Sequence, residues 1–336
     1  MSDRAPRFLI VRLGSLGDVV HAIPAVAALK KRHPDAAIDW VVDPRYVDLV
    51  RLVTVVDRVI PFDPRHAVLA FPTMIRTLRR VGYEAAIDLQ GLLKSAALSR
   101  MIGAPRVIGF PRAHLREPLA RFLYSETPDP GDAPHVIQKG IALMRALGVS
   151  DWSIEFPLAV PRSSAAAVVA ARFGSSAYAL VNPGAAWPNK RWPVDRFGAL
   201  AAAIRERRGL GSLVLWGPGE ESMASGVVAA SRGAAELAPP TTITDIVAIA
   251  KSASLMVSGD TGPLHIAAAV GAPIVALFGP TRPERNGPWA RSDISLSRVD
   301  QCVCHYERRC RRSRPCIDDI SVDEVIAAVE RRIAAR

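Results

Sequence analysis

The segment at residues 258–265 (SGDTGPLH) holds the most suggestive side chains of the sequence. It follows an apolar run typical of a buried strand and precedes IAAAVGA, a small-residue stretch typical of a helix. We therefore expect Asp260, Thr261 and His265 to converge at a strand end, with Gly262 opening the helix. Free amides at a helix N-terminus favour phosphate. The alternative for His265 is a buried structural histidine.

A lysine follows another expected strand end, in the segment Asn182-Pro-Gly-Ala-Ala-Trp-Pro-Asn-Lys190-Arg-Trp-Pro. Gly184 permits close approach of the backbone to a ligand. Lys190 can supply positive charge to a diphosphate there. The alternative is an ordinary solvated loop lysine.

A carboxylate stands at the end of the first expected strand, residues 8–13. Gly14 and Gly17 flank the turn and let backbone amides approach a ligand, and Asp18 follows. A carboxylate at that position can remove a proton from a sugar hydroxyl as a general base. It can equally be a helix N-terminal residue that complements the helix dipole. The glycine spacing is not the full GxGxxG dinucleotide fingerprint.

Two further polar groups follow expected strands. Glu220 or Glu221 can accept hydrogen bonds from ribose hydroxyls, or can simply favour a helix N-terminus. Asp88, Gln90 and Lys94 can hold a polar ligand, or can form a turn with a solvated lysine.

All four cysteines of the chain fall within fifteen residues. Four thiolates in one segment can hold a tetrahedral zinc or an iron centre. The spacing differs from the usual pair of CxxC motifs, and we expect any metal to be structural, not catalytic. The cysteines are Cys302, Cys304, Cys310 and Cys316.

These candidate residues lie in a chain of alternating strand and helix patterns. This alternation predicts βαβ units and parallel sheets. Ligands of open α/β sheets bind beyond the carboxyl ends of the strands. The first series of strands is expected at 8–13, 37–43, 58–63, 84–91 and 106–110, and the second at 177–184, 212–217, 254–260 and 273–279.

The two series are divided near residues 150–175 and predict two Rossmann-like domains. We expect an N-terminal domain over 1–160, a C-terminal domain over 161–320, and a C-terminal helix over 321–336. Ser321 and Glu324 form a capping-box pattern at the start of that helix.

Composition limits the function classes. The 336 residues are 49% hydrophobic and 22% charged, which excludes a disordered or fibrous chain. No apolar run approaches the roughly 18 residues of a spanning helix, and the N-terminal apolar stretch is too short for a signal peptide. We therefore expect a cytoplasmic protein. The net charge of +11 favours anionic partners, namely nucleotides, phosphorylated lipids, a membrane face or nucleic acid.

The combined motifs resemble those of glycosyltransferase family 9, the ADP-heptose:lipopolysaccharide heptosyltransferases, particularly the heptosyltransferase I branch. The resemblance covers most of the chain. It rests on the order and spacing of Gly-Ser-Leu-Gly-Asp18, Asp39-Trp-Val-Val-Asp43, Ile87-Asp-Leu-Gln-Gly-Leu-Leu-Lys94, Arg116-Glu-Pro-Leu-Ala, Lys190-Arg-Trp-Pro, Gly259-Asp-Thr-Gly-Pro-Leu-His265 and Phe278-Gly-Pro-Thr281.

This resemblance implies the GT-B fold, an α/β architecture of two Rossmann-like domains facing across a cleft. It places the acceptor on the N-terminal domain and the nucleotide sugar on the C-terminal one. It implies transfer of heptose from ADP-L-glycero-D-manno-heptose to the Kdo inner core of lipopolysaccharide, with inversion and without a metal or cofactor in the chemistry. The chain contains no Asp-x-Asp motif. The implied partners are Kdo-lipid A and the cytoplasmic face of the inner membrane, as a peripheral enzyme.

The resemblance also implies roles for single residues. Asp18 matches the general base, and Lys190 matches the residue that stabilises the departing diphosphate. The residues implied for donor binding are Gly17, Glu221 (or its neighbour Glu220), Asp260, Thr261, Gly262 and His265, and those for acceptor binding are Arg65, Lys94 and Arg116.

Several alternatives remain at this point. Ala185 and Ala186 stand where heptosyltransferase I carries hydroxyl residues, and the cysteine segment looks more like that of other branches. The second interpretation is therefore a family member that uses another nucleotide sugar or acceptor. A nucleotide-sugar epimerase or a non-catalytic sugar-nucleotide sensor is a weaker one. We expect no nucleic-acid partner, since the sequence has neither an RRM nor a C2H2 pattern.

Overall fold

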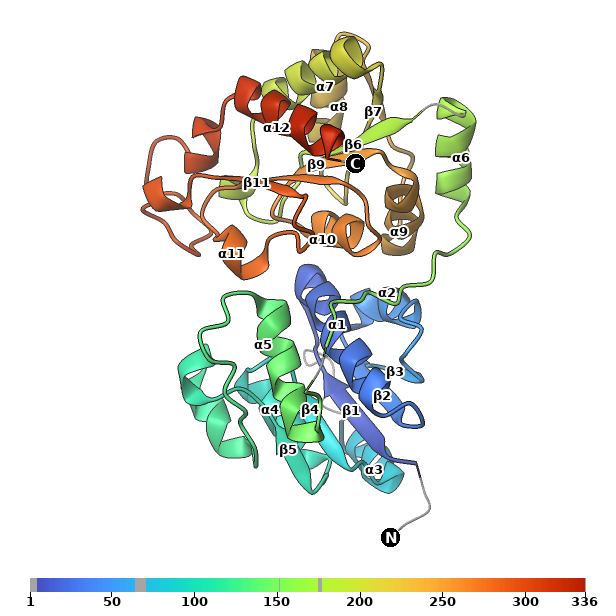
Figure 1. Ribbon diagram of the computed structural model, residues 1–336, viewed down its shortest axis with the longest axis vertical. Coiled ribbons are helices and arrows are strands. Elements are labelled where there is room, and N and C mark those ends of the chain that lie inside the picture. Colours follow the sequence, from blue (N-terminus) through green and yellow to red (C-terminus); the bar gives the residue numbers. More distant parts are fainter. Residues whose placement is uncertain (1–4, 64–70, 151, 175–176, 336) are drawn as a thin grey trace. The chain divides into compact units, whose positions relative to one another are not determined.

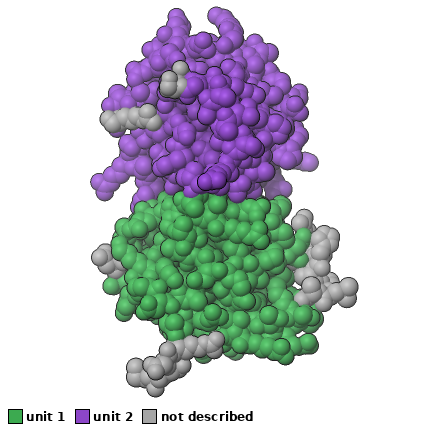
Figure 2. All heavy atoms as spheres, turned by 90° about the vertical axis from the view of Figure 1, so that its right-hand side faces the viewer, with its two compact units in different colours: residues 1–159 green, residues 160–336 purple. Residues whose placement is uncertain are grey.

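The apolar runs of the sequence form two separate parallel sheets. The computed structural model describes residues 5–63, 71–150, 152–174 and 177–335. The chain divides into two compact units, Met1–Ala159 and Val160–Arg336, which Figure 2 colours separately. The helix expected at 321–336 belongs to the second unit.

The first unit contains a five-stranded parallel sheet in the order β3-β2-β1-β4-β5 (Figure 1). Strand β1 is RFLIV, and its last four residues are buried, as expected for a strand covered on both faces. The strands are β1 (Arg7–Val11), β2 (Ala37–Val42), β3 (Arg58–Pro61), β4 (Ala85–Asp88) and β5 (Arg106–Ile108); the helices are α1 (Leu16–Arg32), α2 (Val47–Arg51), α3 (Phe71–Val81), α4 (Leu93–Met101) and α5 (Val136–Leu143).

The second unit contains a six-stranded parallel sheet in the order β11-β10-β9-β6-β7-β8. Two short strands, β8 and β11, lie at its edges and were not expected from the sequence. The strands are β6 (Tyr178–Asn182), β7 (Gly211–Val214), β8 (Ala235–Leu237), β9 (Leu255–Gly259), β10 (Ile274–Phe278) and β11 (Ile294–Ser297); the helices are α6 (Ser164–Phe173), α7 (Val194–Arg208), α8 (Glu221–Ala230), α9 (Ile243–Ser252), α10 (Gly262–Ala269), α11 (Pro283–Asn286) and α12 (Val322–Ala334).

Both sheets have the strand order of a Rossmann fold. In each, the strand order reverses beside the first strand of the unit, between β1 and β4 and between β6 and β9. The predicted α/β fold with two Rossmann-like domains is confirmed. Ligand sites are expected beyond the carboxyl ends of the strands at these two reversal points.

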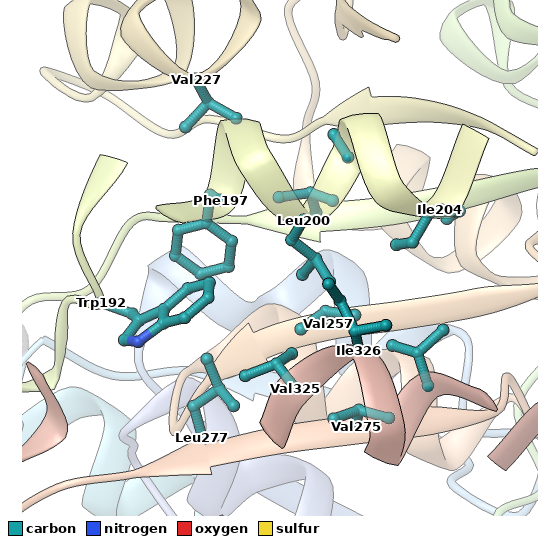
Figure 3. Packing of buried hydrophobic residues seen from close by; sticks show 14 of the residues in the cluster. Trp192, Phe197, Leu200, Ile204, Val227, Val257, Val275, Leu277, Val325 and Ile326 are labelled. Atoms are coloured by element: carbon teal, nitrogen blue, oxygen red, sulfur yellow. The ribbon is translucent and has the colours of Figure 1, made fainter. Parts of the chain in front are cut away.

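The core of the second unit lies between its sheet and helices α7, α8 and α12. Trp192 and Phe197 pack edge to face, with ring centroids 4.9 Å apart (Figure 3). The expected capping box starts α12: Ser321 N donates to Glu324 Oε2 at 2.8 Å, and Glu324 N donates to Ser321 Oγ at 3.2 Å. Val325 and Ile326 then bring α12 into this core.

Candidate active site

A hydrogen-bond cluster joins β6 and β9 at the reversal point of the second sheet. Asn182, the last residue of β6, donates through Nδ2 to Ser258 Oγ at 3.0 Å and to Thr261 Oγ1 at 3.1 Å. Thr261 is the residue before α10, and Gly262 is the first residue of that helix. The first N–H groups of a helix have no partner within the helix. This strand edge therefore presents a helix N-terminus of the kind that binds phosphate.

Lys190 and Asp260 form an ion pair at the same edge. Lys190 Nζ lies 2.5 Å from Asp260 Oδ2, and both side chains are largely buried, with 14% and 4% of their surface exposed. The sequence predicted that both residues follow strand ends, and the structure brings them into contact. A lysine held this way is not an ordinary solvated loop residue.

Asp260 has hydrogen-bonding partners on both carboxylate oxygens. Oδ2 also accepts from Thr281 Oγ1 at 2.7 Å, while Oδ1 accepts from Asn286 Nδ2 at 2.7 Å and lies 3.2 Å from His265 Nε2. Burial alone would raise the pKa of Asp260, but hydrogen bonding to His265 and the charge of Lys190 hold that pKa far below its usual range. Asp260 is thus an ionised residue that positions its neighbours.

His265 lies within this cluster on α10 and is 5% exposed. Its contact with Asp260 makes His265 both a buried structural residue and a member of the site. Thr281 and Asn286 were not predicted as site residues. Thr281 closes the motif Phe278-Gly-Pro-Thr281, but Asn286 follows β10 in a short helix with no recognisable pattern.

The loop that carries Lys190 lies directly against two strand ends. A Cβ on Gly259, at the end of β9, would stand 2.6 Å from the carbonyl oxygen of Lys190. A Cβ on Gly279 would stand 3.0 Å from the carbonyl oxygen of Asn189. Beyond the loop, Trp192 is buried in the core and donates through Nε1 to Ile320 O at 2.9 Å. The close packing of the loop against Gly259 and Gly279, together with the hydrogen bond of Trp192, fixes the position of Lys190.

Cationic groups flank Trp187 in the same loop. Lys190 Nζ lies 4.6 Å from the centroid of the Trp187 ring, and the guanidinium carbon of Arg308 lies 5.9 Å from it. Arg308 belongs to the cysteine segment and was not predicted as a site residue. Its approach adds positive charge beside the proposed diphosphate position.

Of the two adjacent glutamates, Glu220 lies against the glycine turn. A Cβ on Gly184 would stand 2.1 Å from Glu220 Oε2, which also accepts from Gly217 N at 3.1 Å. Glu221 is exposed at the first position of α8. Gly184 is therefore required for the Glu220 carboxylate to reach the ends of β6 and β7.

In the first unit, Asp18 lies in the first turn of α1 beyond β1. Its Oδ2 accepts from Ser15 N at 3.0 Å and from Ser15 Oγ at 2.8 Å, and Arg12 lies 2.7 Å from Oδ1. Asp18 therefore takes part in capping the N-terminus of α1, as the alternative interpretation of the sequence predicted. The Asp18 side chain nevertheless keeps 31% of its surface exposed. A partly exposed, oriented carboxylate at this strand edge can accept a proton.

Comparison with known proteins identifies this pair of Rossmann-like units. The family model described as glycosyltransferase family 9 (heptosyltransferase) matches residues 72–314. The chain belongs to this family. Lipopolysaccharide heptosyltransferase 1 of Pseudomonas aeruginosa is 30% identical over 318 residues, which cover 90% of this chain and 87% of the relative.

Solved structures agree at the level of the fold. An E. coli heptosyltransferase WaaC with ADP has a TM-score of 0.78 at 24% identity, over 97% of this chain and 99% of that one. A family 9 glycosyltransferase from Veillonella parvula has a TM-score of 0.83 at 24% identity, over 100% and 99%. The chain is thus a glycosyltransferase with the GT-B fold of family 9.

In this family 9 chain, Asp88 and Gln90 serve the fold. Asp88 is fully buried, and it accepts hydrogen bonds from Ser95 Oγ at 2.9 Å and Tyr124 Oη at 2.7 Å. Burial raises its pKa. Gln90 Oε1 accepts from the backbone N of Leu13 at 3.0 Å and so joins β4 to the loop before Asp18. The suggestion that these two side chains hold a ligand is not supported.

The two described residues implied for acceptor binding lie on neighbouring elements, since Leu93 N donates to Glu117 Oε2 at 2.7 Å. Lys94 on α4 and Arg116 before the 3-10 helix η3 (Pro118–Leu123) are both exposed. Arg65 lies outside the described residues. Gly17 is buried in the first turn of α1, in the first unit, whereas the other residues implied for donor binding lie in the second.

The four cysteines gather into a small cluster, in which all but the partly buried Cys310 are buried. Cys304 and Cys310 have their Sγ atoms 3.5 Å apart, and Arg311 N donates to Cys304 Sγ at 2.9 Å. This N–H lowers the pKa of Cys304, whereas burial raises the pKa of Cys316 to about 12. Over the described part of the chain, no three His, Cys, Asp or Glu side chains are already arranged to hold a metal ion.

The cysteine segment also touches the Lys190 loop. Asn189 Nδ2 donates to Glu307 O at 2.8 Å, and the Cys316 sulfur lies 3.6 Å from where a Gly279 Cβ would stand. The folding of this segment is therefore connected to the position of Lys190.

Proposed function

We propose that this chain transfers heptose from ADP-L-glycero-D-manno-heptose to the Kdo inner core of lipopolysaccharide. The observation that carries the proposal is the buried Lys190–Asp260 pair beside the N-terminus of α10. A fixed cation and free helix amides at one strand edge suit the diphosphate of a nucleotide sugar. The relatives named lipopolysaccharide heptosyltransferase 1 support heptose as the sugar and lipopolysaccharide as the acceptor.

The proposed reaction is a single displacement with inversion. The acceptor oxygen forms a bond to the anomeric carbon of heptose, and the bond from that carbon to the β-phosphate oxygen breaks. Asp18 takes the hydroxyl proton, and ADP leaves with the bonding electron pair. Lys190 and the amides at Thr261–Gly262 stabilise the charge that develops on ADP. No step of this reaction uses a metal.

Asp260 supports this reaction by holding Lys190 in place. Its carboxylate oxygens already have four partners, which fills the capacity of the group. We therefore assign Asp260 and His265 a positioning role in donor binding. An arriving diphosphate competes with Asp260 for the Lys190 ammonium. The pair therefore offers the diphosphate a cation that is already held in position.

Ribose recognition is assigned to the glutamate pair at the start of α8. The family resemblance points to Glu221 with Glu220 as its neighbour. The close approach of Glu220 to Gly184 favours Glu220 as the residue that reaches the nucleotide.

The acceptor assignment rests on the basic surface of the first unit. Lys94 and Arg116 are exposed and can pair with the anionic sugars or phosphates of Kdo-lipid A. Arg65 is proposed for the same role from the family resemblance. No helix among the described residues is long and apolar enough to cross a membrane, and we propose peripheral association with the cytoplasmic face of the inner membrane.

We further propose that the four cysteines hold one structural zinc or iron ion. The donor set suits either metal, and the backbone N–H of Arg311 already points to the sulfur of Cys304. The metal would fix the segment that supplies Arg308 and Glu307 to the Lys190 loop, with no part in the chemistry.

The experiment that tests the function measures ADP release with ADP-heptose and Kdo2-lipid A together and separately. Release that requires both substrates, with an inverted anomeric configuration in the product by NMR, supports the proposal. A folded enzyme that releases no ADP contradicts this donor–acceptor pair. Because Ala185 and Ala186 carry no hydroxyl group, a family 9 enzyme with another nucleotide sugar or acceptor is the second candidate. Thermal shifts with a series of nucleotide sugars would identify it.

A further inference from the structure

Two large apolar side chains stand exposed on the 3-10 helix η3. Leu119 is 63% exposed and Phe122 is 77% exposed, although both are large hydrophobic residues. They are three residues apart, and side chains at i and i+3 of a 3-10 helix lie on the same face. Leu119 and Phe122 therefore form one apolar ridge that points away from the unit.

The opposite side of η3 is firmly packed. Ala120 is completely buried with Ala96 and Val107, and η3 contacts α4. Glu117 Oε2 accepts from Leu93 N at 2.7 Å and ties the start of η3 to the start of α4. Leu93 itself is 40% exposed. The ridge is thus held on a folded support and is not a frayed end.

Basic residues surround the apolar ridge. Arg112 and Arg116 are exposed shortly before it in the sequence, and Arg121 lies within η3. Lys94 is also exposed, and it follows Leu93, which is hydrogen-bonded to Glu117. Over residues 111–123, the sequence contains one acidic residue, Glu117, which is occupied by the contact to Leu93. An apolar ridge within a basic surround complements the interface of a bilayer with anionic headgroups.

We propose that Leu119 and Phe122 insert into the anionic membrane surface and dock the enzyme there, with Leu93 and the surrounding basic residues at headgroup level. The inference rests on the proposed lipid-linked acceptor, and it names the surface by which the enzyme reaches that acceptor. The docking surface is defined as Leu93, Leu119, Phe122, Lys94, Arg112 and Arg116.

The test is sedimentation with vesicles of phosphatidylethanolamine and phosphatidylglycerol, compared with phosphatidylcholine vesicles. We expect the wild-type chain to prefer the anionic vesicles. The double variant Leu119→Ser/Phe122→Ser should bind them at least about tenfold more weakly, since two apolar contacts are lost. The matched control is Val160→Ser/Val168→Ser, which replaces two exposed valines of the second unit. It is expected to bind like the wild type.

Turnover separates this inference from the proposed function. The double variant should retain wild-type turnover of a deacylated, water-soluble Kdo acceptor, but lose turnover of acceptor embedded in vesicles. Wild-type vesicle binding by the double variant would overturn the inference and leave the proposed transfer intact. A ridge that mediates self-association would instead show as a change of mass between wild type and variant in light scattering, and would also overturn it. If the wild-type chain turned over neither the soluble nor the vesicle-embedded acceptor, this result would count against the proposed function alone.

Discussion

Lys190 Nζ lies 2.5 Å from Asp260 Oδ2, in a pair formed from the segments that follow two neighbouring strands of one sheet, β6 and β9. The pair is nearly buried, so its charges are screened less than those of a surface pair. It presents one cation, already oriented, at the edge where a helix N-terminus also opens. Such preorganisation favours the leaving diphosphate in the transition state.

Removal of the cation should reduce catalysis. Lys190→Ala is expected to lower kcat by about 10²–10³-fold, because one electrostatic stabiliser of the leaving group is lost. It should also lower stability by about 3 kcal/mol, because Asp260 stays buried without its countercharge. Steady-state kinetics and thermal unfolding measure the two effects. Lys251→Ala, which removes a lysine bound to the carbonyl of Val270, is the control and should keep wild-type kcat.

The pH dependence of kcat should show no contribution from the ionisation of Asp260. Asp260 has a folded-state pKa far below its usual value of 3.8, so its stabilising contribution is complete above that value and is lost only as the pH falls below it. Asp260 therefore stays ionised between about pH 5 and 9 and adds no limb to kcat there. An acid limb in that range that persists in Asp18→Asn and disappears in Asp260→Asn would contradict this assignment.

The base itself can be tested with a near-isosteric change. Asp18→Asn keeps a side-chain oxygen for the Ser15 N–H and so should preserve the start of α1. It cannot take a proton, and kcat should fall by about 10²–10⁴-fold with donor affinity unchanged. Rates come from ADP release, and donor affinity from calorimetry. Asp48→Asn, at an exposed carboxylate paired with Arg51 in the same unit, should leave kcat unaltered; equal losses in both variants would point to damage to the fold.

Much of this site could be predicted because the strands are short, apolar and buried on both faces. β1, β6, β9 and β10 each contain a run of consecutive apolar residues, so the residues after these runs could be assigned to one edge of a sheet. β8 and β11 were missed because they are edge strands with mixed polarity, AEL and ISLS. An edge strand pairs on one side only, so its sequence is less constrained.

Two residues of the site were harder to predict than Asp260 itself: Asn286, which donates a hydrogen bond to Asp260, and Arg308, which approaches Trp187. Asn286 and Arg308 come from the irregular region after β10, where no periodicity marks which side chain turns inward. Conversely, Asp88 and Gln90 occupy a predicted strand end, yet their hydrogen bonds hold the loop and helix around them. Strand-end position therefore predicts that a polar residue is near the site, but burial and partners decide whether it faces a ligand.

The two adjacent glutamates offer a matched pair of variants. Glu220→Gln should raise KM for the nucleotide sugar by about 10-fold, because a ribose contact made by a carboxylate is worth roughly 1.5 kcal/mol or more. Glu221→Gln is expected to change KM less than twofold, since its side chain is exposed at the start of α8. Initial-rate kinetics with the donor varied gives both values. The opposite order would assign the ribose contact to Glu221.

The cysteine segment should link metal content to the active-site loop. We expect about one zinc or iron per chain in purified protein by elemental analysis, and loss of that metal in Cys304→Ser/Cys310→Ser. Because Asn189 bonds to the carbonyl of Glu307 and Arg308 approaches Trp187, the same variant should raise the Kd for ADP several-fold. Val303→Ser changes an exposed residue between two of the cysteines, and it should retain both metal and ADP affinity. A metal-free wild-type chain with full ADP affinity would exclude the metal, and the segment would then support Lys190 through packing and hydrogen bonds alone.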